Sequence, residues 1–193
     1  MNLPFDILTY EILPNLLPSQ LLDLASTSSI GFDITKPILN LYSESLELKN
    51  ITEYINFCNK YNLFYIKNLT LKDYKENKVN NKRILKFNCS KNNLTTLPEL
   101  PNVKHLYCNN NELTELPELP NVKYLYCSHN KLTALPELPN VKGLTCYNNK
   151  LVKLPELPNV EELDCSNNQI IELPELPNIE NLNCYNNKLV KLP

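Results

Sequence analysis

A strict 19-residue repeat governs the second half of the chain. Cysteine recurs at this interval in six successive segments, at Cys89, Cys108, Cys127, Cys146, Cys165 and Cys184. Asparagine keeps the same interval, at Asn92, Asn111, Asn130, Asn149, Asn168 and Asn187. A fixed period of this length indicates a solenoid, in which each repeat forms one coil and packs against its neighbours. Residues 84–193 therefore predict six stacked coils.

Each repeat places apolar residues where a short strand would bury them. Leu106 and Cys108 share one face of a strand, because side chains alternate across it. Asn111 follows at the turn, where its amide can bond backbone groups of neighbouring coils that would otherwise be buried without a partner. The next segment, Leu-Pro-Glu-Leu-Pro, has two prolines in five residues, which forbid a helix. We therefore expect strands on one side of the coils and an extended return on the other.

Residues 84–193 resemble a known repeat family. The pattern L/V/I-x-x-L-x-C-x-x-N-x-L is that of leucine-rich repeats, and LPELPNVKYLYCSHNKLTALPELP (116–139) is similar to the bacterial-type repeats of the YopM and IpaH effector families. The resemblance implies an α+β repeat fold: a leucine-rich-repeat solenoid with parallel strands on its concave face, a polyproline-like convex side and a small helical N-terminal cap. IpaH-like proteins carry ubiquitin-ligase activity in a separate domain, so the repeats do not imply that activity.

The first 83 residues lie outside the regular repeat. We expect residues 1–44 to form a helical F-box-like or cap region. Residues 45–83 predict irregular early repeats, with a strand over 45–50, an amphipathic helix over 51–61, a strand over 66–72 and a polar loop over 72–83. The array of six 19-residue rungs then occupies residues 84–193.

Residues 3–24 read LPFDILTYEILPNLLPSQLLDL, with paired apolar residues at Ile7-Leu8 and Ile12-Leu13. This run resembles an F-box. F-box/leucine-rich-repeat proteins of eukaryotes and their large DNA viruses use that segment to bind a Skp-type adaptor of a cullin ubiquitin ligase. Three departures from the motif are an extra residue between Leu8 and Ile12, the presence of Pro14 and the absence of tryptophan. A plain helical cap over the first coil explains the same sequence. Both interpretations stay open. The expected adaptor-binding residues are Leu3, Pro4, Ile7, Leu8, Ile12, Leu13, Leu16, Leu21 and Leu22.

The outward strand positions predict a contact surface for a protein target. Tyrosine gathers there on the second to fourth rungs, and tyrosine is enriched at protein contacts because its ring is large and stiff with a polar tip. Strand propensity alone could also place tyrosine at these positions. Basic residues flank the tyrosines on one side and acidic residues on the other, which would orient a target. The predicted partner-binding residues are Lys86, Asn88, His105, Tyr107, Asn109, Tyr124, Tyr126, Thr145, Tyr147, Glu162, Asp164, Asn183 and Tyr185.

Other kinds of site find less support in the sequence. The cysteine column predicts a buried apolar ladder rather than a metal site, because zinc needs ligands that converge from several directions. His105 and His129 lack the partners of a nucleophile–base pair, so we expect no catalytic residue, metal or cofactor. The glutamates of the Leu-Pro-Glu-Leu-Pro segments predict a solvated edge. The basic run over 72–91 predicts a solvated loop more than a nucleic-acid site, since few aromatic residues interrupt it.

Composition narrows the setting of the chain. With a formal net charge of −2 and two glycines, it has no overall attraction to nucleic acid and no glycine-rich phosphate loop. No lysine or arginine precedes Lys36, and no apolar run is long enough for a signal peptide or a membrane span. Reduced cysteines and a cytoplasmic location are therefore expected, in the host cytoplasm if the chain is viral. The last rung lacks a polar cap, which predicts end-to-end self-association or a further segment.

Overall fold

The computed structural model describes residues 51–60 and 67–191, and the chain divides into two units, Met1–Ile66 and Lys67–Pro193. In the first unit, helix α4 (Ile51–Lys60) is amphipathic and buries Tyr54, Ile55 and Cys58 completely. This is the helix expected over 51–61. The strand expected over 45–50 and the adaptor-binding positions lie outside the described residues.

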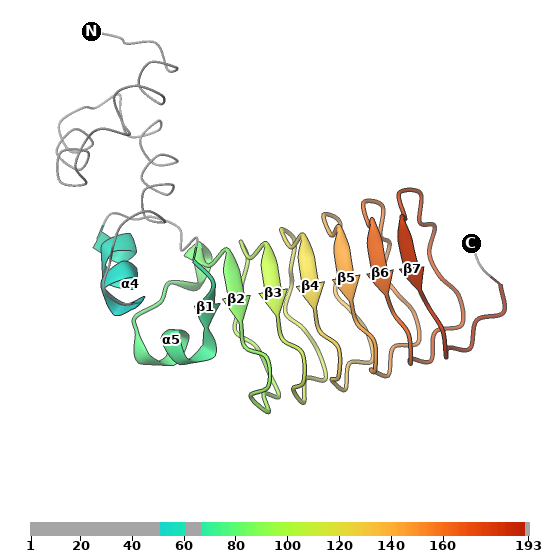
Figure 1. Ribbon diagram of the computed structural model, residues 1–193, viewed down its shortest axis with the longest axis horizontal. Helices are drawn as coiled ribbons and strands as arrows, with labels where there is room; N and C mark the ends of the chain where they lie inside the picture. Colours follow the sequence, from blue (N-terminus) through green and yellow to red (C-terminus); the bar gives the residue numbers. More distant parts are fainter. Residues whose placement is uncertain (1–50, 61–66, 192–193) are drawn as a thin grey trace, which may run out of the picture. The chain divides into compact units, whose positions relative to one another are not determined.

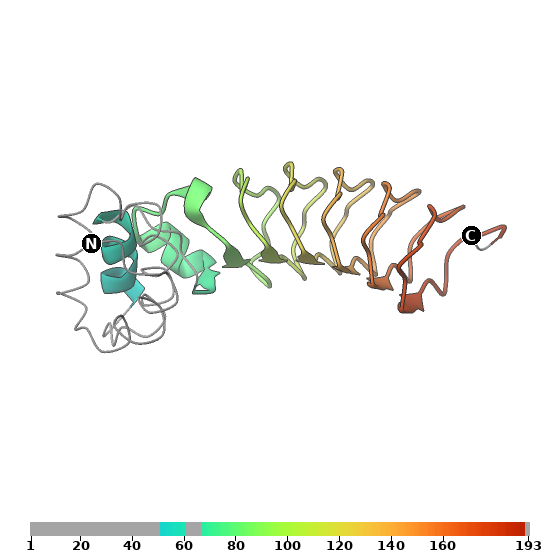
Figure 2. The ribbon, with the colours of Figure 1, turned by 90° about the horizontal axis from the view of Figure 1, so that it is seen from above.

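The second unit is a parallel sheet in which the strands follow one another in chain order (Figure 1). From β2 to β7 each residue pairs with the one 19 positions later, as His105 does with Tyr124. Viewed from above, the strands line one side of the coils and the return segments the other (Figure 2). The strands are β1 (Leu69–Thr70), β2 (Lys86–Asn88), β3 (His105–Tyr107), β4 (Tyr124–Tyr126), β5 (Gly143–Thr145), β6 (Glu162–Asp164) and β7 (Asn181–Asn183).

The prediction of a polar loop over residues 72–83 is wrong. Helix α5 (Leu71–Glu76) and a 3-10 turn, η3 (Asn81–Arg83), occupy this segment, and β1 is shorter than the strand expected over 66–72. A capping box starts α5: the backbone N–H of Asp73 donates to Thr70 Oγ1 at 3.2 Å, and the Thr70 N–H donates to Asp73 Oδ2 at 2.8 Å. This local cap stabilises a short helix in a polar sequence, because it satisfies N–H groups that the first helical turn leaves without partners.

The core of the array is a double column of leucine and cysteine. Leu106, Cys108, Leu125 and Cys127 have no exposed surface, as the alternation of the strands predicts. All seven cysteines are free thiols, and burial raises the pKa of Cys89 to about 12. The cysteines therefore pack as small apolar side chains, and Cys184 on the last described rung is the half-buried exception in this column.

Asparagine links each coil to the one before it. Asn130 Nδ2 donates to the carbonyl oxygens of Cys108 and Cys127, each at 3.0 Å, and Asn130 Oδ1 accepts the backbone N–H of Leu113 at 3.0 Å. The same three bonds recur at the corresponding asparagine of the other coils from Asn111 to Asn187. The ladder satisfies backbone groups that the strands cannot pair, and it confirms the role expected of these asparagines.

In each coil from β3 to β7, one turn residue adopts a left-handed backbone conformation. Asn110, Asn148, Asn167 and Asn186 have φ of 53–55°, and His129 takes the same place with φ 53°. Asparagine tolerates this region better than most residues because its short side chain bonds locally. His129 is thus a turn residue. The Leu-Pro-Glu-Leu-Pro segments contain no helix, as expected, and their glutamates are exposed.

Candidate protein-binding face

The outward side chains of β2 to β7 form a continuous surface, here called the sheet face. On β3, His105 and Tyr107 are half-buried on this face while Leu106 between them is fully buried. The in-register pairing stacks each outward residue beside its equivalent on the next strand. The sheet face consists of Lys86, Asn88, His105, Tyr107, Tyr124, Tyr126, Gly143, Thr145, Glu162, Asp164, Asn181 and Asn183.

Two stacked aromatic pairs occupy the middle of the sheet face. The rings of Tyr107 and Tyr126 lie 4.8 Å apart and only 3° from parallel. The rings of His105 and Tyr124 are stacked at 5.0 Å and 20°. We call these four residues the aromatic platform. Each ring restricts its neighbour, so less side-chain freedom remains to be lost when another molecule covers them.

His105 and Tyr126 of the platform are uncharged near physiological pH. Burial lowers the pKa of His105, and the positive charges of Lys86, Lys104 and Lys123 lower it further. Burial also raises the pKa of Tyr126, with smaller contributions from its neighbours on the sheet. The imidazole is therefore uncharged and the phenol protonated, so the platform offers flat apolar faces with polar tips.

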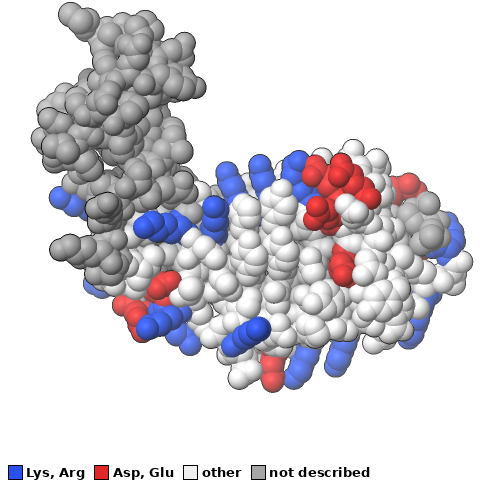
Figure 3. Space-filling model, viewed as in Figure 1, with Lys and Arg blue, Asp and Glu red and all other residues white. Residues whose placement is uncertain are grey.

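Charge changes sign along the edge from which the strands begin. Lys104, Lys123 and Lys142 immediately precede β3, β4 and β5, whereas Glu161 and Glu180 precede β6 and β7. Figure 3 shows basic side chains in a row along one edge of the array, followed by a cluster of acidic side chains. Lys142 Nζ and Glu161 Oε1 lie 2.6 Å apart where the two signs meet. The sheet face thus has a basic and an acidic end.

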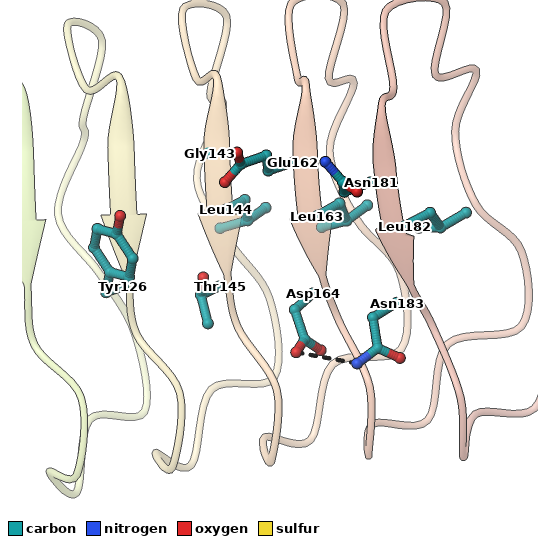
Figure 4. Close-up of a pocket in the computed structure, with 10 residues that line it drawn as sticks. All are labelled: Tyr126, Gly143, Leu144, Thr145, Glu162, Leu163, Asp164, Asn181, Leu182 and Asn183. Carbon is teal, nitrogen blue, oxygen red and sulfur yellow. Dashed lines mark hydrogen bonds between the residues drawn. The ribbon is translucent and has the colours of Figure 1, made fainter.

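A hollow of about 380 Å³ opens on the sheet face beside the platform. Gly143 forms part of its floor, and a Cβ atom there would lie 2.9 Å from Cδ1 of Tyr124. The absence of a side chain at this position lets the Tyr124 ring lean over β5. The lining comes from four adjacent strands (Figure 4) and consists of Tyr126, Gly143, Leu144, Thr145, Glu162, Leu163, Asp164, Asn181, Leu182 and Asn183. We call it the β5–β6 hollow.

The structure places the predicted contact residues in two groups. The first group lies on the sheet face and consists of the platform together with Lys86, Asn88, Thr145, Glu162, Asp164 and Asn183. Asn109, Tyr147 and Tyr185 lie just beyond the strands at the turns, where Tyr147 contacts the His129 ring edge-on at 5.0 Å and Tyr185 accepts a hydrogen bond from Asn167 at 3.0 Å. Tyr147 is thus packed with the turn rather than with the platform. Gly143 and Asn181, which line the hollow, were not among the predicted contact residues. A glycine at an outward strand position leaves space on the sheet face, and this was a signal that the sequence contained.

Metal and membrane-spanning sites are absent from the described part of the chain. Among residues 51–60 and 67–191, no three histidine, cysteine, aspartate or glutamate side chains are arranged so that they could hold a metal ion. No helix in those ranges is long and apolar enough to span a bilayer.

Comparison with known proteins adds the family of the repeat. Residues 120–159 and 158–193 match the family model described as leucine-rich repeats in two copies. Together with the register of the strands and the asparagine ladder, this match decides the fold. The array is a leucine-rich-repeat solenoid. No curated protein matches the sequence.

Several solved structures resemble this leucine-rich-repeat array. YopM from Yersinia pestis, described as a leucine-rich effector protein, is 43% identical with a TM-score of 0.55 over 58% of this chain and 34% of its own. YopM from Yersinia enterocolitica WA-314 is 41% identical with a TM-score of 0.53, over 55% of this chain and 25% of its own. A Shigella effector LRR domain is 40% identical with a TM-score of 0.53, over 55% of this chain and 51% of its own. The chain therefore spans about a quarter to a half of the length of these structures.

Proposed function

We propose that the solenoid binds a protein target across its sheet face, with the aromatic platform as the main contact. The stacked pair of Tyr107 and Tyr126 carries this proposal, because it presents large, half-exposed rings that are already ordered. Such rings contribute strongly to protein contacts. Leucine-rich-repeat solenoids are typically non-enzymatic binding scaffolds, and the target would be held rather than chemically changed.

A display experiment tests this proposal while the target is still unidentified. A library of random peptides on phage is selected on the intact chain, and the affinity of the selected peptides is then measured for the variant Tyr107→Ala/Tyr126→Ala. We expect the affinity to fall by at least about tenfold, as for contact residues at the centre of an interface. The matched control is Glu118→Ala/Glu137→Ala, which removes exposed side chains from the return segments. Equal effects of the two double variants would refute the proposal.

We further propose that the chain is a substrate receptor of a ubiquitin ligase. The F-box-like apolar pattern of residues 3–22 supports this proposal, and these residues lie outside the described ones. They would bind a Skp-type adaptor while the sheet face holds the target, so the chemistry would belong to the partner proteins. The setting would be the cytoplasm, and the host cytoplasm if the chain comes from a large DNA virus. A composition rich in asparagine, lysine, isoleucine and tyrosine is typical of an AT-rich genome, which is consistent with a viral origin. The alternative is a scaffold or effector with no ubiquitin link.

A pull-down with a Skp-type adaptor separates these two functions. The intact chain should retain the adaptor, and Ile7→Asp/Leu8→Asp should abolish retention, because charged groups cannot occupy an apolar interface without a partner. Tyr107→Ala/Tyr126→Ala serves as the control that should leave retention unchanged. No retention by the intact chain would remove the ubiquitin proposal and leave the binding scaffold.

Self-association through the last rung is a further proposal. Leu182 is 39% exposed and Val190 is 84% exposed on this rung, and exposed apolar side chains favour contact with another copy. Light scattering over a range of concentrations tests it, and a single monomeric mass at every concentration would refute it.

A further inference from the structure

The β5–β6 hollow combines an aromatic wall with an acidic one (Figure 4). Tyr126 on β4 lines one end of it, β7 lines the other end, and Glu162 and Asp164 on β6 lie in between. Gly143 and Thr145 on β5 separate Tyr126 from the two carboxylates and bring little volume. Its volume of about 380 Å³ lies in the range of sites that take a small organic group.

The aromatic wall has one ring face free for a ligand. Tyr107 covers one face of the Tyr126 ring in a nearly parallel stack. The opposite face is directed to the next strand, where the residue paired with Tyr126 is Thr145. Threonine is too small to cover a phenol ring, so this face of Tyr126 borders the hollow. The face of an aromatic ring attracts cations through its quadrupole.

The acidic wall is partly fixed in position. Asp164 Oδ1 accepts the backbone N–H of Ser166 at 3.1 Å and its hydroxyl at 2.7 Å, and Asp164 Oδ2 accepts Asn183 Nδ2 at 3.2 Å. These bonds hold the carboxylate without neutralising it. Carboxylate oxygens have several acceptor sites, so Asp164 can still take a further donor.

Glu162 adds a second carboxylate, which is exposed. Figure 4 shows its side chain reaching from β6 toward Gly143 on β5. Lys131 pairs with Glu112 and Lys142 with Glu161, and neither Glu162 nor Asp164 forms an ion pair with a lysine or arginine of the described residues. The hollow therefore carries negative charge that an incoming cation would meet.

We infer that the β5–β6 hollow receives an arginine side chain of the protein target. The flat guanidinium would stack on the free face of Tyr126 and donate hydrogen bonds to Asp164 and Glu162. Arginine fits better than lysine because its planar group can stack on a ring and bind a carboxylate through two parallel N–H groups at once. This inference rests on the proposed function, since it assigns the chemistry of one target residue at the sheet face.

The charge along the sheet face also gives the target a direction. The hollow lies at the acidic end, while Lys86, Lys104 and Lys123 surround the platform at the other end. A target segment with arginine at the hollow and acidic residues three or so strands away, roughly 15 Å at the usual strand spacing, would match both ends. The reverse orientation would place like charges together.

Titration with a small probe tests the inference independently of any protein target. The probe is N-acetylarginine methylamide, and N-acetylcitrulline methylamide is its uncharged counterpart of the same shape. Backbone amide signals of Gly143, Thr145 and Asp164 are followed by NMR. We expect these signals to shift with the arginine probe, with a dissociation constant on the order of millimolar for a single side chain. The dissociation constant of the citrulline probe should be at least about tenfold higher.

The variant Glu162→Gln/Asp164→Asn should weaken arginine binding by at least about tenfold, whereas Glu156→Gln/Glu175→Gln, with the same charge change on the return segments, should not. Glu162→Gln alone, at an exposed position, serves if the double variant does not fold. Absent shifts at the hollow, or equal binding of arginine and citrulline, would overturn the inference. Peptides selected by display that depend on Tyr107 and Tyr126 would then still support the proposed function.

Discussion

Replacing Asn130 with alanine removes four hydrogen bonds of unequal importance. The longest, from Nδ2 to the carbonyl oxygen of Ser128 at 3.3 Å, leaves that oxygen with the Asn110 N–H as donor at 3.0 Å. The carbonyl oxygens of Cys108 and Cys127 each keep a second asparagine donor, from Asn111 at 2.9 Å and Asn149 at 3.1 Å. The backbone N–H of Leu113, which is fully buried, loses its Asn130 Oδ1 acceptor. The main cost should therefore come from one buried donor left without a partner.

The structure allows this cost to be estimated. A buried N–H without a partner costs about 1–3 kcal/mol, and each weakened carbonyl about 0.5 kcal/mol, so the free energy of unfolding should fall by about 2–4 kcal/mol. For a unit of this size that loss corresponds to a fall in the thermal midpoint of roughly 6–16 °C. Thermal unfolding followed by circular dichroism measures it, with urea unfolding as a second measurement.

Asn92 provides a matched control at the other end of the ladder. Asn92 is exposed, and its Nδ2 donates to the carbonyl oxygens of Cys89 and Ser90 at 3.1 and 2.7 Å. Among the hydrogen bonds of the described residues, its Oδ1 accepts no backbone N–H of a preceding coil, so Asn92→Ala should cost no more than about 1 kcal/mol. If Asn92→Ala and Asn130→Ala proved equally destabilising, the reasoning from the orphaned Leu113 N–H would be refuted.

Three further predictions concern single side chains. Cys184, which is half-buried, should react with a thiol reagent before unfolding, whereas Cys127, fully buried and with its pKa raised by burial, should react only afterwards; equal rates would contradict this. An NMR titration should give a pKa for His105 below about 6.5, and Lys104→Gln should raise it. Because the unfolded state binds this proton first as the pH falls, the stability contributed by neutral His105 is present above about pH 6.5 and is lost as the pH falls toward the lower folded-state pKa. Gly143→Ala should lower the free energy of unfolding by about 1–3 kcal/mol, because the added Cβ would lie 2.9 Å from a tyrosine ring carbon; an unchanged thermal midpoint would show that the ring moves freely.

The repeat made the array largely predictable from sequence. A 19-residue period fixes which residues pair between coils, and alternation within the strand then separates Leu106 from Tyr107. The same reasoning did not find α5, because Thr70 and Asp73 form a cap that depends on local backbone geometry more than on hydrophobic pattern. The F-box-like interpretation of residues 3–24 stays a prediction.

The sequence predicts which residues lie on the sheet face, but not how their side chains stack or where a hollow forms. The outward columns contain the platform residues, yet the stacking of Tyr107 on Tyr126 needs the rotamers as well as the register. The β5–β6 hollow forms because small residues on β5 lie beside large ones on β4, with Gly143 next to Tyr124 and Thr145 next to Tyr126. A void between unequal side chains is a property of several coils together, and a pattern defined within one coil does not describe it.

The uniform register makes the spacing of surface features adjustable in fixed steps. Each strand pairs only with the strands of adjacent coils. Deleting one whole 19-residue period between β4 and β6 would therefore leave the remaining strands in the same parallel, in-register pairing. The acidic end would then move toward the tyrosines by one strand spacing, about 4.8 Å. Gain or loss of single coils would in this way change the distance between the tyrosines and the acidic end of the sheet face without changing the residues of either.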